Sequence, residues 1–167
     1  SSGRVVTQFR LRFDCVRNQL LLQYQGSTFA AESKVQEFVM YTGSGKKKDS
    51  VLFRKGYPSV GKGNEGTYYH VLLDDKVQLL RLISKNIVEQ KELIATSAVR
   101  GRLEEEEKYY LYKDGNMIYL PADKIELLKT LPEHADALSQ FMTEKNFRLK
   151  NPGEFVIVIR KYLELQQ

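Results

Sequence analysis

Side chains that could carry out a reaction or hold a metal are few in this chain and far apart. His70 and His134 are the only histidines, and neither has a cysteine or a second histidine at the spacing of a metal site. Cys15 is the only cysteine, which excludes an internal disulfide. The nucleophile elbow Gly-x-Ser-x-Gly does not occur. The sequence therefore indicates no catalytic, cofactor-binding or metal-binding residues.

One glycine pattern, at residues 61–66, matches the dinucleotide-binding motif Gly-x-Gly-x-x-Gly. That motif needs a strand before the glycines and a helix after them, because the helix N-terminus holds the pyrophosphate. Here Pro58 precedes the glycines, and the strand-like residues 68–71 follow them. We therefore interpret the segment as a flexible loop.

A basic loop covers residues 43–50 and contains Lys46, Lys47 and Lys48 in succession. Its start is similar to a phosphate loop, but Met40 stands where the first glycine should be, and Lys47 where a Ser or Thr should bind magnesium. The three lysines instead form a candidate electrostatic contact with an anionic partner. The simpler alternative is a solvated loop that keeps a sheet edge from pairing.

Tyrosines provide the second candidate for an interaction surface, led by Tyr68 and Tyr69. The alternative role, which we favour, is packing between strands. The other tyrosines in this group are Tyr109, Tyr110, Tyr112 and Tyr119.

The acidic run at residues 104–107 is most simply a solvated segment, although it could bind a cation weakly.

The composition is that of one ordinary globular domain, with 167 residues, 42% of them hydrophobic and 28% charged. The net charge of +5 comes from residues 1–100, whereas residues 101–167 are slightly acidic. A basic half can attract nucleic acid or anionic lipid, but these charges are scattered, so a solvated surface is favoured and nucleic acid is not. No apolar run is long enough to cross a membrane, and no signal peptide is visible after the opening Ser-Ser-Gly.

Alternating apolar and polar residues predict many short strands joined by short turns, which is typical of an antiparallel meander. In the first strand Cys15 alternates with Leu11 and Phe13, so we expect its thiol on the buried face. Phe38 and Val39 lie on opposite sides of a later strand, whose buried face stays open. Residues 92–102 stay ambiguous. The expected strands are 5–16, 19–24, 28–31, 34–42, 51–54, 67–73, 77–84, 87–90, 108–112 and 117–120.

The clearest local signal is a hairpin centred on Asp114 and Gly115. Asp-Gly between two runs of β-forming residues is typical of a type I′ turn, which needs a positive φ at both central residues. Pro121 then ends the second strand.

Helical patterns replace the strand pattern after this hairpin. Asp123, with Glu126 three residues later, predicts the start of a helix. Ile125, Leu128 and Leu131 then share one face of that helix.

Two more helices are expected, at residues 133–145 and 151–165. The second is contested, because the run 155–159 favours a strand by propensity. The start Asn-Pro-x-Glu at Asn151 favours a helix instead, and we predict a helix. The side chains expected on its buried face are Phe155, Ile159 and Tyr162.

Four stretches carry a resemblance to known proteins. They are residues 51–57 with their glycine-rich sequel, residues 109–115, the Leu131-Pro132 break, and residues 145–151 before the tail. Together they resemble a family of uncharacterised proteins from Bacteroidota, whose members usually carry a secretion signal and are rich in strands with a short helical tail. The resemblance implies a periplasmic, outer-membrane-associated or secreted protein. It implies no activity and no catalytic residues.

These patterns predict an α+β fold, with an antiparallel, curved sheet in residues 1–121 and a helical cap in residues 122–167 of one compact domain. The function we favour is a non-enzymatic binding or interaction module of the cell envelope. Its expected partner is an anionic envelope component or another protein. The alternative is a hydrolase or small-ligand carrier with a pocket between sheet and helices.

Overall fold

The computed structural model describes residues 10–31, 35–42, 49–90 and 100–166. Antiparallel strands are followed by a C-terminal helical part, so the predicted α+β fold is confirmed. None of the helices described is long and apolar enough to cross a membrane. The strands are β1 (Arg10–Asp14), β2 (Gln19–Tyr24), β3 (Ser27–Ala30), β4 (Glu37–Thr42), β5 (Asp49–Arg54), β6 (Tyr69–Asp74), β7 (Gln78–Gln90), β8 (Arg100–Lys113) and β9 (Asn116–Leu120). The helices are α1 (Lys124–Thr130), the short 3-10 helix η1 (Pro132–His134), α2 (Ala135–Glu144) and α3 (Pro152–Leu165).

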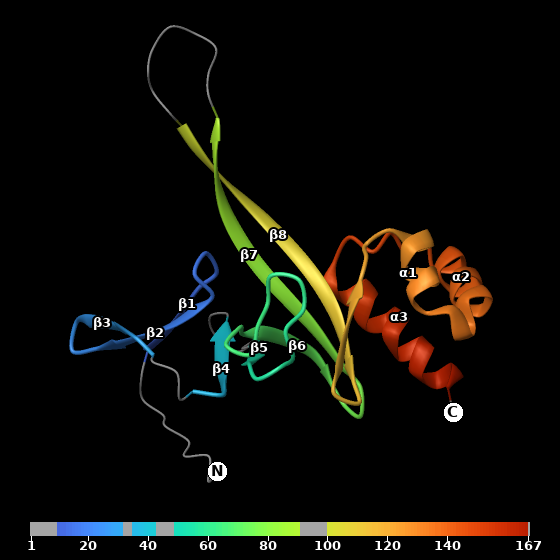
Figure 1. The fold of residues 1–167 in the computed structure, drawn as a ribbon, viewed down its shortest axis with the longest axis horizontal. Helices are drawn as coiled ribbons and strands as arrows, with labels where there is room; N and C mark the ends of the chain where they lie inside the picture. The colour runs from blue at the N-terminus through green and yellow to red at the C-terminus, as the bar shows by residue number, and fades with distance from the viewer. Residues whose placement is uncertain (1–9, 32–34, 43–48, 91–99, 167) are drawn as a thin grey trace, which may run out of the picture.

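The strands form two sheets, whereas the sequence suggests one (Figure 1). β1, β2 and β3 form a small antiparallel sheet, and β4 to β9 form a six-stranded antiparallel sheet in chain order. The small sheet packs one face on the large sheet, where the Phe13 ring lies 4.6 Å from that of Phe53 and 5.7 Å from that of Phe38, between centroids. Phe38 therefore lies on the buried side of β4, and Val39 lies on the exposed side. Packing between faces, not strand pairing, joins the first three strands to the rest.

The predicted type I′ turn between β8 and β9 is confirmed. Asp114 and Gly115 have φ values of 50° and 80°, and the flanking residues Lys113 and Asn116 are cross-strand partners. β7, in contrast, is one unbroken strand where the sequence predicts two. Its polar middle stays paired with β8 throughout, and there Lys85 forms an ion pair with Glu105, its direct partner.

Apolar clusters cover both faces of the large sheet. One face packs against the helices at one end and the small sheet at the other, and the opposite face packs against the loop between β5 and β6. The cluster under the helices includes Leu79, Tyr109, Leu111, Leu120, Leu127, Leu138, Met142, Phe155, Val158 and Ile159. Under the small sheet lie Leu20, Phe38, Phe53 and Tyr68. The opposite face holds Tyr57, Tyr69, Val71, Leu80, Leu82 and Tyr110.

α1 begins where the sequence predicts, but it buries a different face. The Asp123 carboxylate accepts hydrogen bonds from the N–H groups of Ile125 and Glu126, at 2.9 and 3.0 Å. Of the three residues expected to share a face, Leu131 is buried and Leu128 packs partly against the core, whereas Ile125 is 65% exposed, and Leu127 is buried in its place. A helix of 7 residues has too few turns for periodicity to fix its buried side, and packing against the sheet decides it.

The tail helix is confirmed as α3. The Asn151 side chain accepts a hydrogen bond from the Glu154 N–H at 3.0 Å, and Glu154 accepts one from the Arg148 N–H at 2.9 Å. Phe155 and Ile159 are fully buried, as the predicted helical face requires. The cap and the apolar spacing together outweigh the strand propensity of residues 155–159.

Cys15 lies in the turn after β1 and is half-buried, so its expected place on the buried face of a strand is wrong. β1 ends at Asp14, before Cys15, because the Asp14 carboxylate accepts hydrogen bonds from the N–H groups of Val16 and Arg17, at 2.9 and 3.2 Å. Burial raises the pKa of the Cys15 thiol, which disfavours the reactive thiolate.

Candidate functional site

A row of side chains crosses all six strands of the large sheet on the face that the helices and the small sheet cover. Phe38 and Phe53 lie under the small sheet, and Tyr109 and Leu120 lie under the helices. His70 and Arg81, the two polar members of the row, therefore lie between the small sheet and the helices, and we call this part of the face the strip. In order of direct cross-strand pairing the row is Phe38, Phe53, His70, Arg81, Tyr109 and Leu120.

Glu107 joins this row, because it lies two residues before Tyr109 and so faces the same side of β8. Arg81 forms an ion pair with the Glu107 carboxylate, and the Tyr109 hydroxyl donates a hydrogen bond to it at 2.7 Å. Burial alone would raise the pKa of Glu107, but the bonds from Arg81 and Tyr109 outweigh it and lower that pKa. Burial, and then the bond to Glu107, raises the pKa of Tyr109. Arg81 and Tyr109 thus both bond to the Glu107 carboxylate, while the buried Nε of Arg81 has no hydrogen-bond partner among the described residues.

His70 is uncharged in the folded protein near neutral pH. Burial, and then the positive charge of Arg81, lowers the pKa of His70 to about 4. Its ring packs against that of Phe53, 5.6 Å away between centroids. A general base works best when its pKa lies near the working pH. The strip therefore suits packing better than acid–base chemistry.

Stability should fall as the pH drops from about 6.5 towards 4, partly because of His70. In this window the unfolded chain binds a proton at His70, whereas the folded chain does not, because its pKa is about 4. After discounting for the exposed part of the ring, the effect should be at most about 2 kcal/mol. Chemical denaturation at pH 7 and pH 5 measures it, and His70→Leu should reduce the difference between the two. An identical difference in both proteins would contradict the buried, neutral state of His70.

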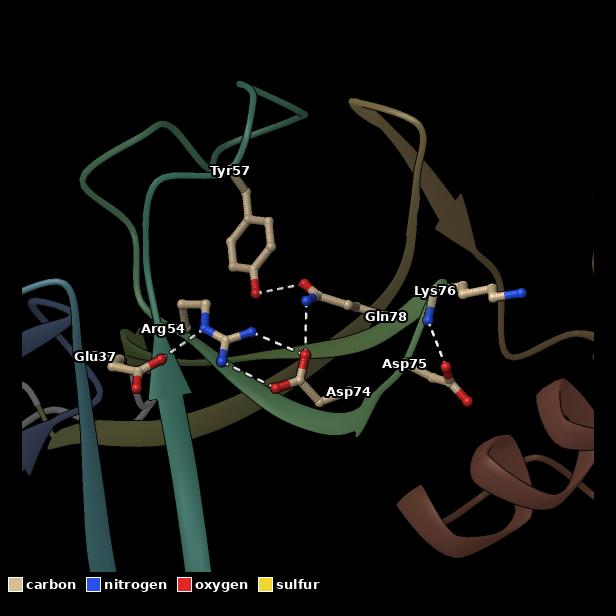
Figure 2. A network of polar contacts seen from close by, with 7 residues as sticks. All are labelled: Glu37, Arg54, Tyr57, Asp74, Asp75, Lys76 and Gln78. Carbon is tan, nitrogen blue, oxygen red and sulfur yellow. Dashed lines mark hydrogen bonds and ion pairs between the residues drawn. The ribbon is translucent and has the colours of Figure 1, made fainter.

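A second polar network lies on the opposite face, centred on Arg54 at the end of β5 (Figure 2). Arg54 donates to Glu37 at 2.8 Å and to both carboxylate oxygens of Asp74 at 2.9 Å. Gln78 donates to Asp74 at 2.7 Å, and the Tyr57 hydroxyl donates to Gln78 at 2.8 Å. The network connects β4, β5, β6 and β7 to the loop after β5.

The single guanidinium of this network, on Arg54, pairs with the carboxylates of both Glu37 and Asp74. The hydrogen bond between Arg54 and Asp74 lowers the pKa of Asp74 and raises that of Arg54. A bidentate pair of this kind fixes geometry, so it holds neighbouring strands in register. Within the described ranges, no three His, Cys, Asp or Glu side chains gather as a metal site would require.

Tyr68 and Tyr69, expected as candidates for an interaction surface, are buried, with exposures of 5% and 0%. Tyr68 packs under the small sheet and donates its hydroxyl to the Val35 carbonyl at 2.6 Å. Tyr69 packs edge-on against Tyr57 and Tyr110 on the opposite face. Successive residues of an extended chain point to opposite sides, so the two rings serve two cores and do not form one surface.

The glycine-rich segment 61–66 belongs to the loop that covers the second face, and the strand β6 follows it. Its glycines allow close packing, since a Cβ atom on Gly63 would lie 2.0 Å from the Tyr69 hydroxyl oxygen. The absence of a helix directly after this described segment agrees with its interpretation as a loop and not as a dinucleotide site.

Lys46, Lys47 and Lys48 lie outside the described residues, so their role stays a prediction. Replacing all three with Ser should weaken binding to an anionic partner and leave folding intact. Attraction between surface charges is screened over about 10 Å at roughly 0.1 M salt, so binding by the wild type should also fall as salt rises. The test is a titration of both proteins with lipopolysaccharide, anionic vesicles and DNA. Equal binding by the two, or none by either, would remove these lysines from the candidate site.

The feature that sequence reasoning missed is a two-stranded arm (Figure 1). β7 pairs with β6 only as far as Arg81, and β8 pairs with β9 only from Tyr109 onward. Beyond these points, residues 82–90 and 100–108 pair with each other and with no other described strand. We call these two segments the arm. The arm exists because β7 and β8 are longer than the strands beside them. β7 and β8 have 13 and 14 residues, and their neighbours β6 and β9 have only 6 and 5.

Ion pairs neutralise most of the acidic run 104–107 at the base of the arm. Glu105 pairs with Lys85 at 3.1 Å, and Glu106 pairs with Lys108 at 3.0 Å. Glu107 is held by Arg81. The run therefore has little charge left for the weak cation binding considered from the sequence.

Comparisons of the chain with protein-family models, with curated proteins and with solved structures find no match.

Proposed function

We propose that this protein is a non-enzymatic binding or interaction module, and that the arm is its contact element. The observation that carries the proposal is the arm itself, which extends from the large sheet with both edges unpaired among the described strands. A two-stranded ribbon is marginally stable alone, and its edges can accept further strands. A partner on the arm would supply the contacts that the ribbon lacks.

The proposed location of this module is the cell envelope, in the periplasm, at the outer membrane or outside the cell. Support comes from the resemblance of residues 51–57 and 109–115 to Bacteroidota proteins that usually carry a secretion signal. The proposed partner is an anionic envelope component or another protein.

Two features support binding over catalysis. Arg81 and Tyr109 bond to Glu107, and the members of the Arg54 network bond to one another, so these polar groups stabilise the sheet. The space between sheet and helices, where a hydrolase or carrier would need its pocket, is filled by apolar side chains such as Leu111 and Phe155. A depression between β6 and α3 holds about 280 Å³ and is open, whereas small-molecule sites usually enclose roughly 300–1,000 Å³.

An arm-shortened variant tests the proposal. Asn86 and Glu104 are cross-strand partners, so replacing residues 87–103 with Asn-Gly would close the ribbon with a two-residue turn. The ion pair between Lys85 and Glu105 would remain. Thermal stability should stay close to that of the wild type, because the described residues of the deleted part pair only with each other and with no other described strand.

The binding measurement compares the full chain with this variant on lipopolysaccharide, on anionic phospholipid vesicles and in self-association by sedimentation. The proposal predicts that the full chain binds at least one of these and that the variant loses that binding. Equal binding by both proteins, or no binding by the full chain to any of the three, would overturn it.

A further inference from the structure

We infer that the arm pairs with a second copy of this chain, through the free edge of β8 in an antiparallel register centred on Leu103. This pairing rests on the proposed binding role of the arm and names its partner. Two arms would form one four-stranded sheet in the order β7, β8, β8, β7, with a two-fold axis at Leu103. An edge strand that pairs antiparallel with its own copy gives a closed, symmetric dimer.

The backbone of β8 presents hydrogen-bonding groups at this edge. Lys85 donates its N–H to the Cys15 carbonyl at 3.3 Å, so its backbone groups point away from β8. Bonded and non-bonded pairs alternate in an antiparallel ladder, so its partner Glu105 also points its groups away from β7. Leu103, two residues along, does the same. Its N–H and C=O are therefore available to the Leu103 of a second copy.

Charges around Leu103 are self-complementary in this register. Pairing about Leu103 places Arg102 of each copy opposite Glu104 of the other. Both residues are exposed, and neither has an ion-pair partner in the described part of the chain. They occupy non-hydrogen-bonded positions, where side chains of facing strands approach most closely. Two Arg–Glu pairs would thus flank the axis.

Leu103 supplies the apolar part of the contact. It is 54% exposed in the single chain, although charged residues surround it in the sequence. At the axis the two Leu103 side chains would lie on the same face of the joined sheet and shield each other from water. Pairing also turns a marginal two-stranded ribbon into a four-stranded sheet.

The edge of β7 is less suited to self-pairing. A register centred on residue 87 would place Lys85 opposite position 89 of the second copy. However, Lys85 already forms an ion pair with Glu105, and the Cys15 carbonyl accepts its N–H. No described residue covers the edge of β8 between positions 100 and 108 in this way.

Charge reversal tests both the partner and the register. Sedimentation of the full chain over a range of concentrations measures the monomer–dimer equilibrium. Arg102→Glu turns two attractive pairs into two repulsive ones, so it should weaken the dimer by about tenfold or more, and Glu104→Arg should do the same. The double variant Arg102→Glu with Glu104→Arg exchanges the charges and should restore dimerisation. Lys76→Glu makes the same charge change in the turn that precedes β7, far along the strand from the arm, and should have no effect.

The outcomes separate this pairing from the proposed function. A wild type that stays monomeric up to its solubility limit would overturn the pairing, as would a double variant that is not restored. Equal weakening by Arg102→Glu and Lys76→Glu would indicate net charge instead of register. If the pairing fails and the arm-shortened variant still loses binding to lipopolysaccharide or vesicles, the binding role of the arm stands with a different partner.

Discussion

Replacing Phe155 with alanine should lower the free energy of unfolding by about 3–5 kcal/mol. The Phe155 side chain is fully buried, and its ring stacks on that of Tyr109, with 3.8 Å between centroids and 10° between planes. The loss has two sources, which are the apolar surface removed from the core and the cavity left between α3 and β8. Because β8 also forms the base of the arm, this contact links the helical part to the arm.

Denaturant titration followed by circular dichroism measures this effect. Ile157 provides the matched control, since it lies on the same helix but is 44% exposed. Its replacement by alanine should change the free energy of unfolding by less than about 1 kcal/mol. An unchanged stability in Phe155→Ala, or equal losses in both variants, would mean that α3 does not pack on the sheet through this face.

The second large effect should come from Gly63→Ala, which we expect to destabilise the protein by about 1–3 kcal/mol. A Cβ atom at this position would lie 2.0 Å from the Tyr69 hydroxyl oxygen and 3.2 Å from the ring carbon that bears it. Tyr69 is fully buried against Tyr57 and Tyr110, so its ring cannot move aside without opening that cluster. The loop or the sheet must shift instead.

Tyr69→Phe makes this prediction specific. The Tyr69 hydroxyl is buried and has no hydrogen-bond partner among the described residues, so its removal should stabilise the protein by about 1 kcal/mol. In that background Gly63→Ala should cost clearly less, because the closest atom is gone. A double-mutant cycle of unfolding free energies measures the coupling. Strictly additive effects would show that Gly63 does not approach Tyr69 as described.

The parts of the fold that could be predicted depend on contacts within a few residues. The turn at Asp114 and Gly115 needs only residues that accept a positive φ. The starts of α1 and α3 need only the capping side chains of Asp123 and Asn151, each bonded to N–H groups two or three residues away. Such signals are complete in the sequence itself.

The candidate site could be predicted only in part. The packing role favoured for the tyrosines holds for Tyr68, Tyr69, Tyr109 and Tyr110, which are buried, but not for Tyr119, which is 46% exposed. The strip of His70, Arg81 and Glu107 was missed. These residues are far apart in the sequence and share no motif, and they meet only because strand register makes Arg81 a direct partner of both His70 and Tyr109. Register depends on long-range pairing, which no local pattern contains.

By itself the sequence determined the turns, the helix caps and the order of strands before helices, because side chains and backbone neighbours a few residues apart decide these. Only the tertiary structure decided that there are two sheets and that β7 and β8 extend beyond the neighbouring strands β6 and β9. The join between the sheets shows why. The Asn18 side chain donates to the Tyr68 carbonyl at 3.0 Å and accepts from the Tyr68 N–H at 2.7 Å, across 50 residues of chain. Contacts of that span follow from how whole faces pack, and residue spacing does not encode them.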